Sequence, residues 1–205
     1  MIDNIQIIDD FFTPEIFEKI NNYMNTEQWE CHCITRKDQD RLGDYAYWNI
    51  TPFYDEFFSI TLKNIIEQKL NRRLQTYRIV ALSQTFGQDG TFHTDHECLN
   101  NIDFKNRQNF DTNNVTFCFY FNNEIVEESG GNIYFKIPNE KYLICAEPLK
   151  NRGIFFPAYL LHKPTAFNLT NKFQRFCITW KFYDLDISDT KLPNDVLLDS
   201  PLDNI

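Results

Sequence analysis

The stretch Phe86-Gly87-Gln88-Asp89-Gly90-Thr91-Phe92-His93-Thr94-Asp95 decides the architecture that we expect for this chain. In an extended strand, side chains two positions apart point to the same face, so His93 and Asp95 would lie side by side. An imidazole and a carboxylate are two of the three ligands of a facial Fe(II) site, and His162 is the obvious donor of the third. One H-x-D can also arise by chance in a chain with four histidines. Its meaning therefore depends on the segments around it.

The composition is that of a globular chain with an unusual aromatic content. We expect one domain over residues 1–205, which is long enough for a substantial core. Twenty Phe and ten Tyr favour a β-rich fold with wide packed faces. The net charge of −9 argues against a protein that tracks nucleic-acid phosphates, a local basic groove aside. We therefore expect no nucleic-acid partner.

The N-terminus and the cysteines indicate the compartment. The first residues contain neither the basic nor the apolar region of a secretory signal, and no apolar run approaches a membrane span. The six cysteines are scattered, and those in apolar runs suit reduced, buried thiols. Cys31 and Cys33 flank His32, but no second pair of zinc ligands follows at finger spacing. We expect a cytoplasmic protein without membrane contact.

Two helices are expected before the main strands. Thr13-Pro14-Glu15 is a helix start with an N-cap, a proline at the first position and an acidic first turn, and helical spacing continues to Met24. Thr51-Pro52 repeats this device, and a second apolar stripe continues to about Leu70. The segment between them is polar and mixed. It includes the aromatic group Tyr45, Tyr47 and Trp48, which suits a buried cluster or a substrate lid.

From residue 74 the pattern changes to short strands whose spacing is typical of a sandwich or jelly roll rather than of alternating β and α units. The expected strands are 77–82, the His93 strand, 115–121, 132–137, 142–146, 153–156, 160–165 and 175–182. A long polar connection at 97–113 predicts a lid or a disordered loop. Residues 184–205 are acidic and interrupted by proline, and we expect an irregular tail.

The order of these motifs resembles that of the 2-oxoglutarate/Fe(II)-dependent oxygenases, specifically the prolyl-4-hydroxylase-like group. Two helices and a strand precede an aromatic–Gly–x–x–Gly turn and H-x-D. The apolar strand Phe117-Cys-Phe-Tyr-Phe-Asn, Gly130-Gly131-Asn-Ile-Tyr-Phe, a lone His162 and an Arg-x-Cys strand follow. The resemblance covers about residues 5–183. It implies a mainly β fold with N-terminal helices and a double-stranded β-helix (jelly-roll) core.

The resemblance also implies the chemistry. His93, Asp95 and His162 match the iron ligands, and Arg175 matches the residue that binds the far carboxylate of 2-oxoglutarate. Thr179 shares the strand face of Arg175 and is a candidate for the wall of the cosubstrate pocket. The family is a dioxygenase family that uses Fe(II), 2-oxoglutarate and O₂, releases succinate and CO₂, and in some members uses ascorbate.

One position departs from the family pattern, and the substrate stays open. Phe86 stands where the family commonly has Tyr, so Tyr77 or another residue would have to supply a phenol to the cosubstrate. The first hypothesis is hydroxylation of a peptidyl residue, foremost proline, and the alternative is a free amino acid or another small molecule. An AlkB-like nucleic-acid demethylase is disfavoured because Arg175 is the last arginine. A non-catalytic jelly-roll module is disfavoured because the whole ligand set is present.

Overall fold

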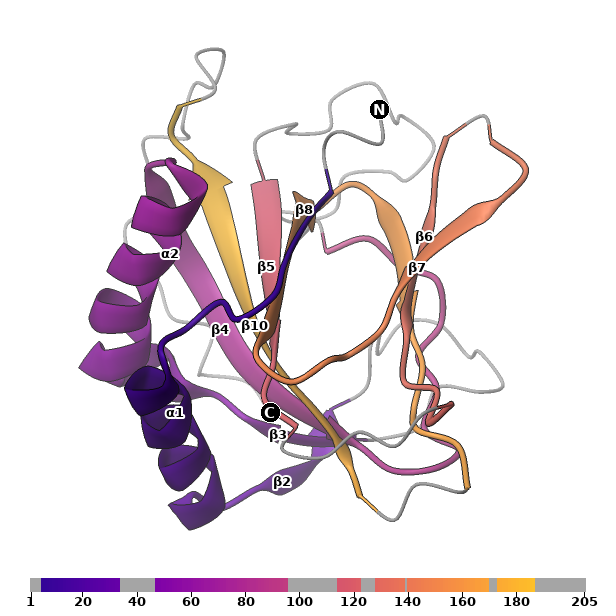
Figure 1. Ribbon diagram of the computed structural model, residues 1–205, viewed down its shortest axis with the longest axis horizontal. Helices are drawn as coiled ribbons and strands as arrows, with labels where there is room; N and C mark the ends of the chain where they lie inside the picture. The colour runs from indigo at the N-terminus through magenta and orange to yellow at the C-terminus, as the bar shows by residue number, and fades with distance from the viewer. Residues whose placement is uncertain are drawn as a thin grey trace.

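Two β-sheets of unequal size face each other, and helices α1 and α2 pack on the outer side of the larger sheet (Figure 1). This computed structural model describes residues 5–33, 47–95, 114–122, 128–138, 140–169 and 173–186. The large sheet has the strand order β1-β8-β5-β10-β4-β3-β2 and the small sheet β7-β6-β9, with every pairing antiparallel. The strands are β1 Gln6–Ile8, β2 Glu30–Cys33, β3 Tyr47–Ile50, β4 Leu74–Gln84, β5 Asn114–Tyr120, β6 Ile133–Lys136, β7 Leu143–Ala146, β8 Arg152–Pro157, β9 Leu161–Pro164 and β10 Arg175–Asp184.

Helix α1 (Pro14–Thr26) begins at the predicted residue. The Thr13 hydroxyl accepts a hydrogen bond from the backbone N–H of Ile16 at 3.5 Å, and Pro14 occupies the first helical position, where its missing N–H costs nothing. Its apolar face is buried against the large sheet, with Phe17, Ile20 and Met24 in the core. The predicted stripe therefore fixes which side of this helix faces inward.

The second helical region differs from the prediction that a helix begins at Thr51-Pro52. Thr51 makes no side-chain cap, and Pro52–Tyr54 forms a short 3-10 turn. Asp55 provides the start instead, because its carboxylate accepts the N–H of Phe57 at 2.8 Å. A π-helical segment at Phe57–Leu62 then leads into α2 (Lys63–Leu70). The wider turn keeps the apolar stripe inward, and its buried members are Phe58, Leu62, Ile66 and Leu70.

Strands β2 and β3 occupy part of a segment in which we expected no strand. β3 pairs with the end of β4 through Trp48 and Ser83, and β2 pairs with β3 at the edge of the large sheet. β2 is the edge strand, and an edge strand needs no continuous apolar pattern. Tyr47 is buried while Trp48 is 38% exposed, so the aromatic group is split between the two faces. Tyr45 lies outside the described residues.

The aromatic residues fill two separate cores. One lies between the helices and the large sheet and includes Phe11, Phe58, Phe117 and Trp180. The Trp180 indole donates to the Phe58 backbone carbonyl at 3.2 Å, and its predicted packing role is confirmed. The second core lies between the two sheets and includes Ile133, Phe135, Ile154, Phe156 and Leu160. The mainly β, double-stranded β-helix fold that the sequence predicts is confirmed.

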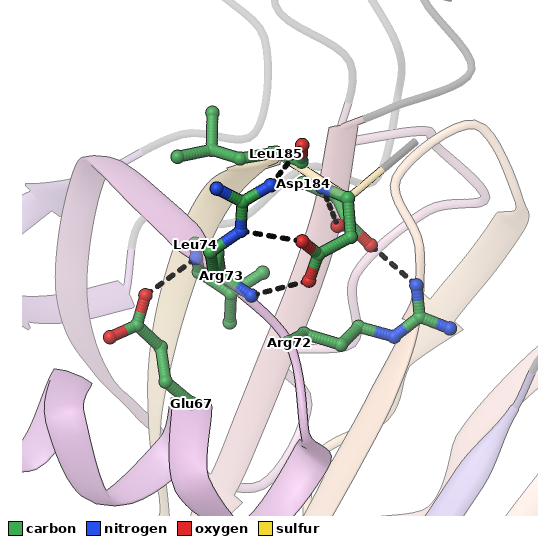
Figure 2. A network of polar contacts seen from close by, with 7 residues as sticks. Glu67, Arg72, Arg73, Leu74, Asp184 and Leu185 are labelled. Atoms are coloured by element: carbon green, nitrogen blue, oxygen red, sulfur yellow. Dashed lines mark hydrogen bonds and ion pairs between the residues drawn. The ribbon is translucent and has the colours of Figure 1, made fainter. Parts of the chain in front are cut away.

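A polar network holds the junction between α2 and β4 to the end of β10 (Figure 2). Arg72 pairs with the buried carboxylate of Asp184 at 2.6 Å, and Arg73 pairs with Asp186 at 2.7 Å. Glu67 accepts the backbone N–H of Leu74 at 2.6 Å. Asp184 is thus the last residue of β10 rather than the first residue of an irregular tail. The rest of that predicted tail, 187–205, lies outside the described residues.

The described helices bear on the expectation that the protein has no membrane span, and the described thiols on the expectation that the cysteines are reduced. None of the described helices has the length and apolar character needed to cross a membrane. Cys118 and Cys177 are buried free thiols, and Cys31 and Cys145 are exposed ones. The side chains of His32 and Cys33 lie outside the described part of the chain, as does the polar connection 97–113.

Candidate metal centre

The segment after β4 reaches the small sheet through an interrupted pairing with β9. Gly90 donates its N–H to Pro164 O at 2.9 Å, and His93 and His162 exchange both backbone hydrogen bonds at 2.9 Å. Gly90 and His93 are three residues apart, whereas their partners Pro164 and His162 are two residues apart. The segment before Asp95 therefore contains one extra residue, which interrupts the ladder. The strand expected through His93 and Asp95 is therefore an isolated bridge at His93. A Cβ on Gly90 would lie 2.9 Å from the Pro164 ring, so glycine permits this approach.

The bridge brings the three predicted ligand side chains together. The Nε2 atom of His93 lies 3.7 Å from Asp95 Oδ1, and the Nε2 atom of His162 lies 3.6 Å from Asp95 Oδ2. All three ligand atoms lie within 4.8 Å of one another. Asp95 is held in place by its backbone N–H, which donates to Ala158 O at 2.9 Å. One carboxylate and two imidazoles that converge in this way could hold one divalent metal ion.

Each histidine is held in the tautomer that a metal requires. The Nδ1 atom of His93 lies 2.8 Å from Thr91 O, and the Nδ1 atom of His162 lies 2.9 Å from Leu160 O. A carbonyl oxygen only accepts, so each Nδ1 must carry the proton and donate it. The lone pair of each ring is then on Nε2, the atom that faces Asp95. The donor set consequently fits a metal without rotation of either ring.

The electrostatics of this cluster keep Asp95 charged and His162 neutral. Burial alone would raise the pKa of Asp95, but Lys181, the two imidazoles and the Thr116 hydroxyl outweigh it and hold that pKa below its usual range. Burial lowers the pKa of His162 to about 4, although the neighbouring Asp95 opposes this change. An ionised carboxylate and a neutral imidazole are the forms that bind a metal.

Lys181 is a site residue that the sequence analysis missed. Its ammonium lies 3.1 Å from Asp95 Oδ1, while the Thr116 hydroxyl donates to Asp95 Oδ2 at 2.8 Å. Both side chains come from the large sheet, where Lys181 of β10 is the register partner of Thr116 of β5. The signal was present, because strand alternation places Lys181 on the same face as Arg175.

Arg175 is fully buried at the start of β10, on the same face as the metal cluster. Its Nε donates to Gly131 O at 2.7 Å, and its Nη1 donates to Gln84 Oε1 at 2.7 Å. Its Nη2 donates to the Tyr120 hydroxyl at 3.0 Å. Among the residues that the structure describes, no carboxylate pairs with this guanidinium. A buried cation without a carboxylate partner favours the binding of an external anion.

The other residues considered for cosubstrate binding lie differently. Thr179 is half-buried on the expected face, but its hydroxyl donates to Val80 O at 3.3 Å within the sheet. Phe86 is 62% exposed. Tyr77 packs against Tyr183 with tilted rings near the start of β4. Gln84, which pairs with Arg175, is the last residue of that strand, roughly 20 Å away. The phenol beside Arg175 belongs to Tyr120, which sequence reasoning did not single out.

Two buried thiols complete the surroundings of Arg175. Cys177 Sγ lies 3.6 Å from Arg175 Nη1. A hydrogen bond from the Cys118 thiol, together with the Arg175 charge, outweighs burial and lowers the pKa of Cys177 to about 7. The same contact with Cys177, with burial, raises the pKa of Cys118 well above its usual range. Cys177 thus faces the predicted pocket, as expected for a residue on the Arg175 face.

The comparisons with known proteins find similarity in structure only. No family model and no curated protein sequence matches the chain. A Trichoplax adhaerens prolyl hydroxylase in complex with a peptide of the hypoxia inducible factor oxygen degradation domain has a TM-score of 0.62 at 17% identity, over 88% of this chain and 84% of its own. A Pseudomonas putida prolyl-4-hydroxylase has a TM-score of 0.62 at 12% identity, over 88% of this chain and 92% of its own.

A third similar structure has ligands bound to it. HygX from Streptomyces hygroscopicus, with nickel, 2-oxoglutarate and hygromycin B bound, has a TM-score of 0.63 at 11% identity. The match covers 89% of this chain and 84% of HygX. The fold of this chain is therefore the fold of the 2-oxoglutarate/Fe(II) oxygenases, which the sequence resemblance predicted.

Proposed function

We propose that the protein is a 2-oxoglutarate- and Fe(II)-dependent dioxygenase in which His93, Asp95 and His162 bind the iron. The observation that carries this proposal is the convergence of the three ligand atoms within 4.8 Å, with both Nδ1 protons already donated to backbone carbonyls. Accidental clusters rarely control both the position and the tautomer of each histidine. The fold shared with known oxygenases supports the same conclusion.

Arg175 is the proposed anchor for the far carboxylate of 2-oxoglutarate. Its planar guanidinium is buried, and its described partners are Gly131 O, Gln84, Cys177 and Tyr120, none of which is a carboxylate. A carboxylate matches that geometry and offsets the cost of burying the cation. The Tyr120 hydroxyl accepts from Arg175 and can donate its own proton to the same carboxylate. Thr179 is proposed to line the pocket rather than to bind the cosubstrate by its hydroxyl.

The protein's own residues position the reactants and control charge. Iron and 2-oxoglutarate, when bound, supply the oxidation of a substrate C–H bond by O₂ with release of succinate and CO₂. Thr116 and Lys181 hold the two oxygens of Asp95 so that the carboxylate keeps one orientation. The second core, with Phe135 and Phe156 packed around the His162 ring, excludes water from that side of the cluster.

The proposed substrate is a peptidyl residue, foremost proline. The structural similarity to two prolyl hydroxylases supports this, one of them in complex with a peptide. A small-molecule substrate is the second candidate, supported by the similarity to HygX with hygromycin B bound. A cytoplasmic location without a nucleic-acid partner stays a prediction, as does a requirement for ascorbate.

The test is succinate production from 2-oxoglutarate with Fe(II) and O₂, over proline-rich peptides, free amino acids and oligonucleotides. We expect turnover by the wild type and by Lys163→Ala, and none by Asp95→Ala. Lys163 is the matched control because it follows His162 but pairs with Asp89 instead. Equal succinate from Asp95→Ala and the wild type would contradict the proposal, as would wild-type protein that binds neither Fe(II) nor 2-oxoglutarate.

A further inference from the structure

The face of the large sheet that carries Arg175 is positively charged beyond what the cosubstrate requires. Lys181 of β10 is the register partner of Arg78 of β4, so both side chains project from the same face on adjacent strands. Strand alternation places Arg175 on that face as well. β4, β5 and β10 contain a single acidic residue, Asp184, which lies on the opposite face and pairs with Arg72. These three strands therefore contribute cations and no carboxylate to the site.

Among the described residues, Lys181 has one carboxylate partner, and the proposed function makes that partner a metal ligand. Its ammonium lies 3.1 Å from Oδ1 of Asp95, the proposed metal ligand. The two positive charges of a divalent metal ion would balance the negative charges of Asp95 and of the nearer carboxylate of 2-oxoglutarate. The far carboxylate balances Arg175. The two imidazoles of the cluster supply no anion. In the part of the chain that the structure describes, no further carboxylate then lies beside the positive charge of Lys181.

An uncompensated ammonium at this position is costly. The Lys181 side chain is only 11% exposed, so water screens it poorly. The hydroxyl of Thr116 donates to Asp95 and does not offset the charge. Within the described residues, the other partners of Asp95 are the two imidazoles and the Ala158 carbonyl, none of them anionic. A further anion beside Asp95 would lower the energy of the loaded site.

We propose that the substrate carries a carboxylate that binds Lys181 beside the metal. The inference rests on the proposed function and adds the substrate's chemical class to it. One carboxylate matches the single positive charge of the Lys181 ammonium. Because Lys181 touches a metal ligand, a carboxylate bound to it holds its neighbouring carbon atoms next to the metal. The carboxylate can be that of a free amino acid or of an Asp or Glu side chain in a peptide.

The competing explanation is that Lys181 only orients and neutralises Asp95. That role predicts weaker metal binding when Lys181 is removed, with no effect on the choice between an acid and its amide. Substrate recognition predicts the reverse pattern. Acid and amide differ in charge and hardly in shape, so they separate the two explanations.

The experiment uses the full chain loaded with Mn(II) and 2-oxoglutarate and measures paramagnetic relaxation of probe protons. Three acid and amide pairs serve as probes, namely acetate and acetamide, L-proline and L-prolinamide, and a blocked Pro-Asp and Pro-Asn dipeptide. In wild type we expect at least one acid to bind about tenfold or more tightly than its amide, the scale of a partly buried charge pair. Lys181→Met should abolish the difference, Lys181→Arg should keep part of it, and Lys163→Met should leave it unchanged.

The outcomes are distinct. A preference for the amino acid alone identifies an α-carboxylate, and one for the dipeptide alone identifies an acidic peptide. Equal binding of acid and amide to wild type overturns the inference, and this comparison needs no variant to fold. A preference that survives Lys181→Met reports coordination to Mn(II) itself and also overturns it. Protein that forms succinate from 2-oxoglutarate but shows no acid preference refutes this inference alone, whereas absence of metal binding refutes the proposed function.

Discussion

Replacement of Arg175 by methionine is the most informative perturbation of the cosubstrate pocket. The side chain is buried, and three of its N–H groups donate to Gly131 O, Gln84 Oε1 and the Tyr120 hydroxyl at 2.7 to 3.0 Å. No carboxylate of the described residues neutralises it, so 2-oxoglutarate would be its counter-ion. Removal of one partner of a buried charged pair costs roughly 2–5 kcal/mol, which corresponds to about thirtyfold to several-thousandfold weaker binding. We expect Arg175→Met to weaken 2-oxoglutarate binding about a hundredfold or more.

The assay is calorimetric titration of 2-oxoglutarate into Mn(II)-loaded protein, followed by KM for 2-oxoglutarate with Fe(II). Arg175→Lys should be intermediate because an ammonium keeps the charge but not the fork of two N–H donors. Lys163→Met is the control for loss of a basic residue near the metal, since Lys163 lies 3.9 Å from Asp89 instead. Mn(II) affinity and the melting temperature of the Mn(II) form test whether the fold is intact. If Arg175→Met binds 2-oxoglutarate within about threefold of wild type while both controls are normal, the pocket has been assigned to the wrong residue.

Three further predictions concern the metal cluster and the thiols. Asp95→Ala should lose Fe(II) binding in calorimetry while keeping the wild-type circular dichroism spectrum, and retained wild-type affinity would show that the ligand is another residue. Metal-free protein should lose about 3 kcal/mol of unfolding free energy between pH 6.5 and 4, because unfolded His162 takes up its proton at 6.5 and folded His162 only near 4. Urea titrations should show this loss for the wild type and a flatter profile for His162→Gln, and equal profiles would refute the assignment. Metal with 2-oxoglutarate should slow alkylation of Cys177, whose pKa is lowered to about 7, but not of exposed Cys145, as peptide mass mapping can establish.

The sequence predicted the strands of both cores well, because central strands that are buried have a clear apolar or alternating residue pattern. β5 is buried along its whole length, and β8 and β10 alternate or run apolar as expected for central strands. β2 was missed because an edge strand needs no apolar face, and β3, which lies between β2 and β4, was missed although three of its four residues are buried. The start of the second helical region was misplaced because Asp55, not Thr51, caps it. A cap depends on backbone angles, which a Thr-Pro pair suggests but does not impose.

The candidate site was predictable where one local motif or one strand face defines it. His93, Asp95, His162 and Arg175 were found from motif order and alternation, and the structure brings the three proposed ligands together. Tyr77 was a poor substitute for the missing phenol because register, not composition, decides which tyrosine reaches Arg175. That register pairs Tyr120 with Cys177, two residues along β10 from Arg175. No single-strand pattern contains this information.

The residues that form the metal cluster and hold it in place come from both sheets. His162 belongs to the small sheet, and His93 is tied to it by two backbone hydrogen bonds, so the imidazoles move as one unit. Lys181 and Thr116 belong to the large sheet and hold the oxygens of Asp95 from the other side. Asp95 is therefore the link between the sheets, and a metal bound to it would join them by strong contacts. Its loss should then loosen the mutual orientation of the two sheets more than the packing within either one.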